Sequence, residues 1–323
     1  MMRAEDGTPS QLAPQTPGRA AKADRAALDA AVLRRAVVRP GGLWRGFEVL
    51  ASTGSTNADL VARAVAGAPE GVVLAAEEQT AGRGRLGRSW VSPPRAALTF
   101  SLLVRPATVS PARRGWLPLL AGVSVASAVR AVAGVDARLK WPNDVLAGPA
   151  KLGGILAEAV GDAIVVGIGL NVSTEPGELP PPRAQGSPRA PGGALPATSL
   201  RVLAAAGQAA QGQAAQGQAA QGAGSGDRER LLTEILAAFE HWYQAWRQAG
   251  GDPDRCGLRA EYTRLCATIG RRVRVELPGG QLLSGLAAGV DPDGRLLVRV
   301  SVPDAEVPDA EVPVAAGDVV HLR

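Results

Sequence analysis

The sequence predicts an α+β protein with two domains, a larger one that mixes strands and helices and a small β-barrel after it. Three observations support this prediction. A length of 323 residues suits two domains. Apolar segments of strand length and of helix length occur together up to about residue 268. From Ile269 onward the pattern changes to short β segments separated by turns that contain Gly or Pro.

The larger domain begins with three expected helices and six expected strands. Residues 1 to about 25 are polar and lack periodicity, and a short helix is expected from Asp24 to Val37. Ser55-Thr56-Asn57 offers capping side chains for a second helix, because the apolar residues that follow share one face. A third helix, rich in small residues, is expected from Leu117 to Val132. The expected strands are Phe47–Leu50, Val72–Ala76, Leu98–Val104, Arg138–Trp141, Gly153–Val160 and Ile164–Val172.

A break in this pattern interrupts the larger domain. Residues 174–198 are rich in Pro and Gly, and 208–222 repeat Gln-Ala-Ala-Gln-Gly three times without a hydrophobic face. We therefore expect a disordered, low-complexity insertion over about 174–226, without a functional role. An amphipathic helix follows, and its apolar face from Leu231 to Trp246 is assigned to the core. The expected division is a disordered or short helical extension at 1–40, a main domain at 41–268 and a C-terminal domain at 269–323.

The C-terminal domain is expected to be a barrel of about 55 residues, because short strands alternate with turns. The doubled Val-Pro-Asp-Ala-Glu sequence at 302–311 is expected to extend a hairpin and to carry no chemistry. The expected strands are Arg272–Leu277, Gln281–Gly289, Arg295–Val300 and Asp318–Leu322.

Composition limits the possible functions. The formal net charge of +5 suits an anionic ligand or an acidic partner, but the charge is too diffuse to indicate DNA binding. Cys256 and Cys266 do not make a disulfide framework or a metal site, which favours a cytoplasmic protein with reduced thiols. The N-terminal 40 residues have no apolar stretch of signal-peptide or membrane length. With His241 and His321 as the only histidines, a histidine-rich metal site or a Ser-His-Asp triad is not expected.

The most informative segment runs from Gln79 to Trp90, where three glycines alternate with Arg83, Arg85 and Arg88. Glycine allows the backbone to approach a ligand closely, and unpaired arginines are costly to bury. The segment therefore either grips a phosphate-bearing molecule or lies free in water. Its Gly-x-Gly-x-x-Gly spacing matches the dinucleotide fingerprint, but the Pro-containing sequence after Trp90 cannot open the required helix. A P-loop sequence is also absent.

Three further segments have both a functional and an ordinary structural interpretation. Gly54-Ser55-Thr56-Asn57 is either a ligand-binding helix start or a simple N-cap. In Lys140-Trp141-Pro142-Asn143-Asp144 the lysine either meets an anion or extends to the surface, and the last two residues suit a turn. Lys151 precedes Gly153-Gly154, where a ligand or another backbone can approach. Gly167 to Val172 is an apolar strand with Asn171 near its end.

In this order, the four segments resemble the biotin protein ligases, densely from Ser55 to Val172 and more loosely from Ile269 to Arg323. The resemblance implies a mixed β-sheet with helices on one face, the catalytic domain of a class II synthetase-like ligase, followed by an SH3-like barrel. It also implies ATP-dependent attachment of biotin to a lysine of a biotin carboxyl carrier protein, through biotinyl-5′-AMP and with Mg²⁺. Relatives can dimerise, and a homodimer is possible here.

The resemblance also assigns roles to residues. Arg85, Arg88 and Lys151 are expected to be catalytic, because they would offset the negative charge that develops at the α-phosphate. Asp144 is a weaker candidate for holding the metal. The residues expected to bind biotin are Ser55, Thr56, Asn57, Gln79, Arg83, Gly84, Arg85 and Lys151. The residues expected to bind ATP are Arg85, Arg88, Trp90, Lys140 and Asn143.

Two other functions are compatible with parts of this pattern. A lipoate or octanoate protein ligase shares the implied fold, although the Arg/Gly segment and Lys140-Trp141-Pro142-Asn143-Asp144 favour biotin. The other alternative function is that of a non-enzymatic sensor, which binds biotinyl-AMP and regulates DNA. About 45 residues precede the first expected strand, which is too few for a winged helix, so DNA binding is not expected.

Overall fold

The computed structural model describes residues 25–90, 92–181, 195–210, 225–300 and 310–322. The predictions for residues 1–24, for the Gln-Ala-Ala-Gln-Gly tract from 211 onward and for the repeat at 302–309 lie outside the described residues.

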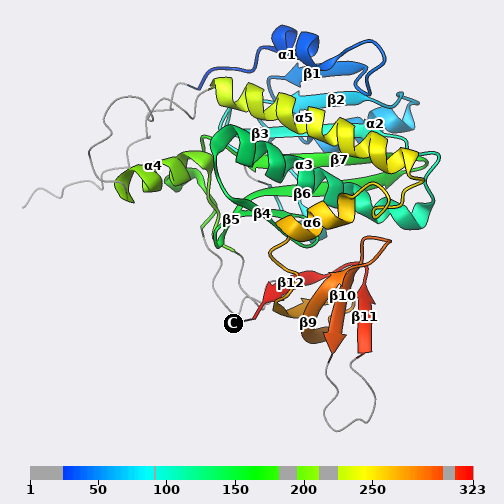
Figure 1. The fold of residues 1–323 in the computed structure, drawn as a ribbon. Helices are drawn as coiled ribbons and strands as arrows, with labels where there is room; N and C mark the ends of the chain where they lie inside the picture. The colour runs from blue at the N-terminus through cyan, green and yellow to red at the C-terminus, as the bar shows by residue number, and fades with distance from the viewer. Residues whose placement is uncertain (1–24, 91, 182–194, 211–224, 301–309, 323) are drawn as a thin grey trace, which may run out of the picture.

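The larger domain is built on a seven-stranded mixed sheet (Figure 1). Strands β1 and β2 are parallel, and every other neighbouring pair is antiparallel. The predicted mixed sheet is therefore confirmed. In spatial order the strands are β1 (Gly46–Leu50), β2 (Val72–Ala76), β3 (Ala97–Val104), β7 (Ala163–Asn171), β6 (Ala150–Val160), β5 (Asp144–Ala147) and β4 (Ala137–Lys140).

Most helices cover one face of this sheet. Helix α3 (Trp116–Ala133) lies between the sheet and α5 (Ser225–Gln248), while α1 (Ala30–Val37) and α6 (Leu258–Leu265) pack beside them (Figure 1). Because α3 contacts protein on nearly all sides, its apolar residues do not form a single stripe. The segment Pro111–Ala133 is long and apolar enough to cross a membrane by length and composition, but most of it is buried inside the protein, as in a core helix.

Helix α2 (Thr56–Val65) covers the opposite face, which corrects the prediction that the helices lie on one face. Alternation along the strands explains this arrangement, since successive side chains point to opposite sides. Leu102 belongs to the core under α3, whereas Leu103 packs with Leu60 and Ala64 of α2. The predicted position of this helix is confirmed, with Ser55 as its N-cap.

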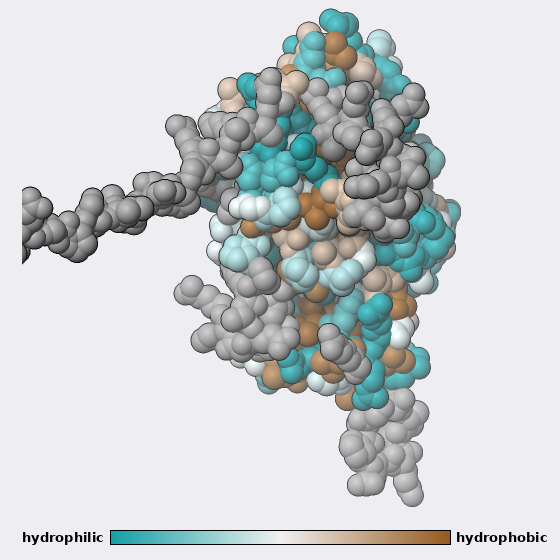
Figure 2. All heavy atoms as spheres, turned by 90° about the vertical axis from the view of Figure 1, so that its left-hand side faces the viewer, coloured by the Kyte–Doolittle hydropathy of each residue, from teal (hydrophilic) through white to brown (hydrophobic). Residues whose placement is uncertain are grey.

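The C-terminal domain is a five-stranded antiparallel sheet, in the order β11-β10-β9-β8-β12. Strand β11 was not predicted, and the closed SH3-like form of this sheet stays a prediction. Its exposed apolar side chains include Leu282, Leu286 and Leu322, and Figure 2 shows apolar residues mixed with hydrophilic ones on this lower part of the molecule. The strands are β8 (Arg272–Glu276), β9 (Leu282–Val290), β10 (Leu296–Val300), β11 (Ala310–Val314) and β12 (Asp318–His321).

Two tryptophans of the larger domain hold the C-terminal domain in place. The Nε1 atoms of Trp116 and Trp141 donate hydrogen bonds to the carbonyls of Pro292 (3.0 Å) and Gly294 (3.1 Å). Both acceptors belong to the turn between β9 and β10. These contacts fix the position of the C-terminal sheet, and therefore of β12, against the larger domain.

Three further sequence-based expectations for the larger domain need correction. Strand β5 is not among the expected strands, and its first residue, Asp144, belongs to the expected turn, although the strand pairs with both β4 and β6. The insertion expected at 174–226 contains ordered structure, because residues 195–199 pack onto β6 and lead into α4 (Leu200–Ala210). Thr198 and Ser199 are buried there. The first helix is also shorter than expected, since Asp29 caps it and it begins at Ala30.

Candidate active site

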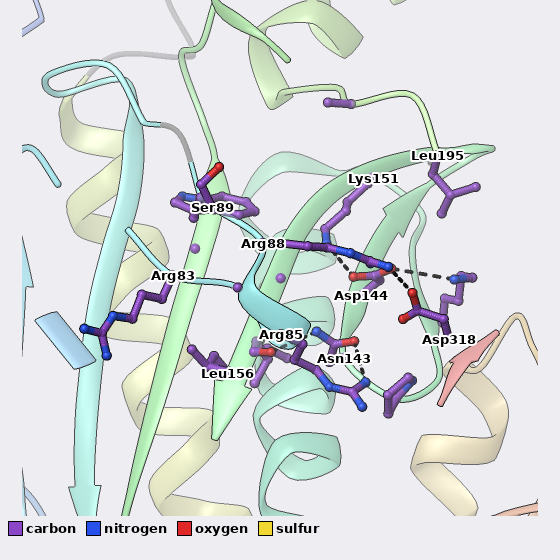
Figure 3. A pocket seen from close by; sticks show the side chains of 18 of the residues that line it. Arg83, Arg85, Arg88, Ser89, Asn143, Asp144, Lys151, Leu156, Leu195 and Asp318 are labelled. Carbon is purple, nitrogen blue, oxygen red and sulfur yellow. Dashed lines mark hydrogen bonds and ion pairs between the residues drawn. The ribbon is translucent and has the colours of Figure 1, made fainter. Parts of the chain in front are cut away.

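A cavity of about 400 Å³ opens on the α2 face of the sheet, between the larger domain and the C-terminal sheet. It brings together all of the predicted site residues, from Ser55 at the start of α2 to Lys151 in β6 (Figure 3). Among the described lining residues, six are cationic and three acidic, so the cavity suits an anion. The cations are Arg83, Arg85, Arg88, Lys140, Lys151 and Arg274, and the acids are Asp144, Glu276 and Asp318.

The floor of the cavity depends on two glycines of β7. A Cβ atom at Gly167 would lie 2.1 Å from Oδ1 of Asn57, and one at Gly169 would lie 2.5 Å from the ring of Trp90. Both distances are too short for real contacts, so only glycine leaves room for these two side chains. The Trp90 ring also lies 3.5 Å from the Cβ position of Gly154 in β6. The apolar strand that the sequence singled out is therefore the base of the pocket.

A polar network forms at the start of α2. The side-chain Oε1 of Gln79 accepts a hydrogen bond from the backbone N–H of Thr56 (2.9 Å) and lies 3.1 Å from the oxygen of the Thr56 hydroxyl. The Thr56 hydroxyl also lies 2.7 Å from Oγ of Ser101, which donates to Oδ1 of Asn57 (2.6 Å). The Asn57 amide nitrogen donates to Glu158 Oε2 (2.7 Å). Ser101 and Glu158 were missed by the sequence analysis, because they lie inside apolar strands without a local motif.

The Arg/Gly segment forms a short hairpin over the cavity. Trp90 N–H donates to Gly82 O (2.9 Å) and Gly84 N–H donates to Arg88 O (2.7 Å). Its tip, Arg85–Gly87, is a 3₁₀ turn. Figure 3 shows Arg85 and Arg88 directed toward Asn143 and Asp144, whereas the side chain of Arg83 extends away from them. The predicted residues are thus brought together, but Arg83 occupies a different side of the hairpin.

Each of the two central arginines has a partner. Arg85 Nη1 donates to Asn143 Oδ1 (3.2 Å), and Arg88 forms an ion pair with Asp318 of β12. Burial lowers the pKa of the Arg85 guanidinium, and Arg88 lowers it further, while Asp144 acts in the opposite direction. A half-buried guanidinium with a neutral hydrogen-bond partner is well placed to receive an anionic ligand.

Asp144 lies between two lysines at the other side of the cavity. Its Oδ1 is 2.6 Å from Nζ of Lys151, and its Oδ2 is 3.7 Å from Nζ of Lys140. Burial alone would raise the pKa of Asp144, but Lys151 and Lys140 outweigh it, so the net pKa is below the usual value. Burial lowers the pKa of Lys140, and the neighbouring cations Lys151 and Arg88 add to this effect against Asp144. A bound anion, in addition to Asp144, would reduce the repulsion between these positive charges.

Two walls of the cavity come from segments to which the sequence analysis assigned no function. Lys151 N–H donates to Pro196 O (2.8 Å) and Thr198 N–H donates to Lys151 O (2.9 Å), which places Leu195 and Ala197 in the cavity lining. Asn171 holds this segment through a hydrogen bond from Nδ2 to Thr198 O (2.9 Å). The length and low complexity of the insertion obscured these contacts, which depend on pairing with a distant strand.

The other wall is β12 of the C-terminal domain. Val319, Val320 and His321 line the cavity together with Asp318. Burial, followed by the charges of Lys140 and Arg271, lowers the pKa of His321 to about 4. His321 is therefore neutral at physiological pH and adds no charge to the site.

The described residues do not provide a separate metal cage, because they contain no group of three His, Cys, Asp or Glu side chains that could hold an ion. Asp144 is the acid nearest the lysines, and both of its oxygens already face ammonium groups. In nucleotide sites Mg²⁺ is commonly bound by one or two carboxylates and by the substrate phosphates. The residues present fit this kind of nucleotide site, in which the triphosphate supplies most of the ligands to Mg²⁺.

Comparison with known proteins identifies the family. The model for the biotin/lipoate A/B protein ligase family matches residues 49–174, and the model for the biotin protein ligase C-terminal domain matches residues 268–322. The chain is 42% identical over 303 residues to the biotin–[acetyl-CoA-carboxylase] ligase of Mycobacterium tuberculosis, which covers 93% of this chain and 97% of that protein. The chain belongs to the biotin protein ligase family.

Other biotin protein ligases agree with this assignment. The bifunctional ligase/repressor BirA of Bacillus subtilis is 30% identical over 259 residues, covering 79% of this chain and 68% of that protein. The structure of the biotin protein ligase from Aquifex aeolicus in complex with biotin and ATP matches with a TM-score of 0.59 at 23% identity, covering 85% of this chain and 98% of that one. This second likeness concerns the fold. It agrees with the mixed sheet and the C-terminal antiparallel sheet described above.

Proposed function

We propose that this protein uses ATP to attach biotin to a lysine of a biotin carboxyl carrier protein, by way of biotinyl-5′-AMP. The observation that carries the proposal is the direction of the hydrogen bonds at the start of α2. Biotin presents a cyclic urea there, which has two N–H donors and one carbonyl acceptor. A complementary site must offer acceptors for the two N–H groups and a donor for the carbonyl.

The network at the start of α2 has this polarity. Asn57 donates its amide hydrogens to Glu158 and Leu156 O, and its Oδ1 is the side-chain atom nearest to the Cβ position of Gly167 on the cavity floor. Gln79 Oε1 is turned toward the backbone N–H of Thr56, which leaves the Gln79 Nε2 group as a donor. Ser101 gives its single hydrogen to Asn57, so the Thr56 hydroxyl donates to Ser101 and keeps lone pairs for a ligand. The pocket thus combines acceptor oxygens with one amide donor.

This polarity favours biotin over lipoate or octanoate. The far end of lipoate is a dithiolane and that of octanoate is a methyl group, and neither forms strong hydrogen bonds. Binding either acid here would leave the acceptors of Thr56 and Asn57 and the donor of Gln79 unpaired in a buried site. A site built for hydrogen bonds discriminates strongly against ligands that lack them, because buried polar groups are then unsatisfied.

In the first step, a carboxylate oxygen of biotin attacks the α-phosphorus of ATP. The bond from that phosphorus to the bridging oxygen breaks, and pyrophosphate leaves with the electron pair. Arg85, Arg88 and Lys151 line the cavity, and in this reaction their fixed cations offset the negative charge that develops at the α-phosphate and lower the barrier by electrostatic stabilisation. Mg²⁺, when bound with the triphosphate, neutralises part of its charge. Lys140 and Asn143 help to orient the nucleotide, and Asp144 holds the two lysines in position.

In the second step, the neutral amine of a carrier lysine attacks the carbonyl carbon of biotinyl-AMP. An amide bond forms, the carbonyl–oxygen bond to the phosphate breaks, and AMP leaves while the amine loses a proton. The net positive cavity suits an acidic carrier domain. We propose that this reaction takes place in the cytoplasm, where Cys256 and Cys266, both free thiols, stay reduced.

The test separates the two steps. Purified protein with biotin and Mg-ATP, without a carrier, is expected to release about one pyrophosphate per site in a burst, because the adenylate stays bound. Addition of a carrier domain should then give continuous turnover and an increase in carrier mass equal to one biotinyl group. Replacing biotin by lipoate or octanoate should abolish the burst. A burst with lipoate but not with biotin would contradict the proposal.

A further inference from the structure

The Asn57 side chain is held from both ends by residues that the proposed reaction does not otherwise use. Its amide nitrogen donates to Glu158 Oε2 (2.7 Å) and to the carbonyl of Leu156 (3.2 Å). Its Oδ1 accepts the hydroxyl of Ser101 (2.6 Å). Every one of these protein groups is well within hydrogen-bond distance, and Asn57 and Ser101 are buried.

The identity of the partners leaves one orientation for the amide. A backbone carbonyl and an ionised carboxylate can only accept hydrogen bonds, so the NH₂ group must face Leu156 and Glu158. A flipped amide would place Oδ1 against two acceptors and lose both hydrogen bonds. The orientation is therefore determined by the chemistry of the neighbours.

This orientation directs an acceptor toward the ligand. The absent Cβ of Gly167 would lie 2.1 Å from Asn57 Oδ1, and Gly167 lines the cavity floor. The oxygen, with one lone pair still available beside Ser101, therefore lies on the side of the sheet where the ligand binds. A ligand group that meets Asn57 must be a donor, such as a urea N–H.

Glu158 lies just beyond the cavity lining. On β6, Gly154 and Leu156 line the cavity, and Glu158 is the next residue on the same face, because side chains alternate along a strand. It is not itself among the lining residues, and its hydrogen bond to Asn57 connects it to the site. We infer that Glu158 is a positioning residue of the biotin site, which, with Ser101, holds the Asn57 amide with its oxygen toward the ureido N–H.

This inference rests on the proposed function, and calorimetric titration of biotin into the full-length protein without ATP tests it. Glu158→Met removes the acceptor at similar size and is expected to weaken biotin binding at least about tenfold, because the amide loses a charged partner. Glu158→Gln keeps a carbonyl acceptor and should stay within about threefold of the wild type. Glu48→Met makes the same change at a surface ion pair in β1 and should leave binding unchanged.

A biotin analogue methylated at its ureido nitrogens provides a readout that altered folding would not produce. In the wild type, methylation removes the donor that meets Asn57 and should cost much affinity. In Glu158→Met the cost should be several-fold smaller, since the acceptor is no longer oriented. Equal costs in both proteins would overturn the inference.

Ser101→Ala provides a second route if Glu158→Met does not fold. It removes the hydroxyl that holds Oδ1, and a several-fold loss of biotin affinity is expected, while Ser124→Ala in α3 removes an equally buried hydroxyl far from Asn57 and should have no effect. Wild-type protein that does not bind biotin would overturn the proposed function and this inference with it. Normal biotin binding by both Glu158→Met and Ser101→Ala would overturn the positioning role alone.

Discussion

At the scale of single residues, the shape of the cavity floor depends on two glycines, which have no side chain. Gly167 and Gly169 adopt ordinary strand conformations, so the backbone conformation does not require glycine at either position. Their role is spatial, because the positions of their absent Cβ atoms are occupied by Asn57 and Trp90.

Gly167→Ala is therefore expected to displace Asn57 and to raise KM for biotin at least about tenfold, with a smaller change in KM for ATP. The measurement is steady-state pyrophosphate release with each substrate varied in turn. Gly289→Ala in β9 is a matched control, since, chain neighbours aside, no atom of the described residues lies within 4 Å of its Cβ position. Unchanged biotin kinetics in Gly167→Ala would show that the ligand does not depend on this part of the floor.

The side chains of Arg85 and Arg83 leave the hairpin in different directions, and this difference allows a second prediction. Arg85→Ala removes a cation from the cavity and, if the proposed role of Arg85 holds, is expected to slow adenylate formation by about 3 kcal/mol, roughly a hundredfold, by analogy with the loss of one oxyanion donor. Arg83→Ala should have a clearly smaller effect on this step, because the Arg83 side chain extends away from Arg88 and Asp144 (Figure 3). Single-turnover formation of biotinyl-AMP measures both variants. Equal losses would contradict the different roles of the two side chains.

Residue types with an obvious chemical role were predictable from the sequence. The Arg/Gly hairpin, Lys151 and the residues after Ser55 form local patterns, and the structure places all of them around one cavity. Ser101 and Glu158 were not predictable, because a serine in a buried strand and a glutamate in a half-exposed one have many ordinary explanations. Their importance comes from contacts with Asn57 across 44 and 101 residues of sequence.

At the scale of elements, β12 links the C-terminal sheet to the reaction centre. Its first residue, Asp318, forms an ion pair with Arg88, and its last, His321, lies near Lys140 and accepts or donates a hydrogen bond at 3.0 Å with Thr268. The strand therefore contacts both the Arg/Gly hairpin and the lysine cluster.

The low pKa of His321 predicts how stability depends on pH. In the unfolded chain this imidazole takes up a proton below about pH 6.5, whereas in the folded protein its pKa is about 4. Between these values the unfolded state binds more protons, so this group lowers stability as the pH falls from about 6.5 toward 4 and has no such effect above 6.5. His321→Asn should reduce the loss of thermal stability between pH 7 and pH 5. Thermal unfolding at both pH values tests this, with His241→Asn on the exposed side of α5 as the control.

Elements with strong local patterns were also predicted well, as α2, α3, β2 and β3 illustrate. Strand β5 was missed because its four residues follow Trp-Pro-Asn, a sequence typical of a turn. The segment at 195–198 was missed because its structure comes from hydrogen bonds with Lys151, to which no local pattern points. In both cases long-range pairing determined the conformation.

At the scale of the whole molecule, the cavity requires both domains in a fixed arrangement. The indole hydrogen bonds of Trp116 and Trp141 maintain that arrangement. Trp141→Phe keeps most of the buried ring and leaves the carbonyl of Gly294 without its donor. It is expected to lower the free energy of unfolding by about 1 kcal/mol. Urea denaturation measures this change, and a wild-type unfolding midpoint would contradict it.

The two indoles donate to main-chain carbonyls of the β9–β10 turn, and a main-chain carbonyl is present whatever residue occupies the position. Docking of the two domains thus depends on the path of the turn, and this path requires glycine at position 294, where φ is +86° and a Cβ atom would lie 2.9 Å from the backbone of Gly115. At position 292, by contrast, another residue that preserves the bend would keep the hydrogen bond from Trp116, because the acceptor there is a main-chain carbonyl.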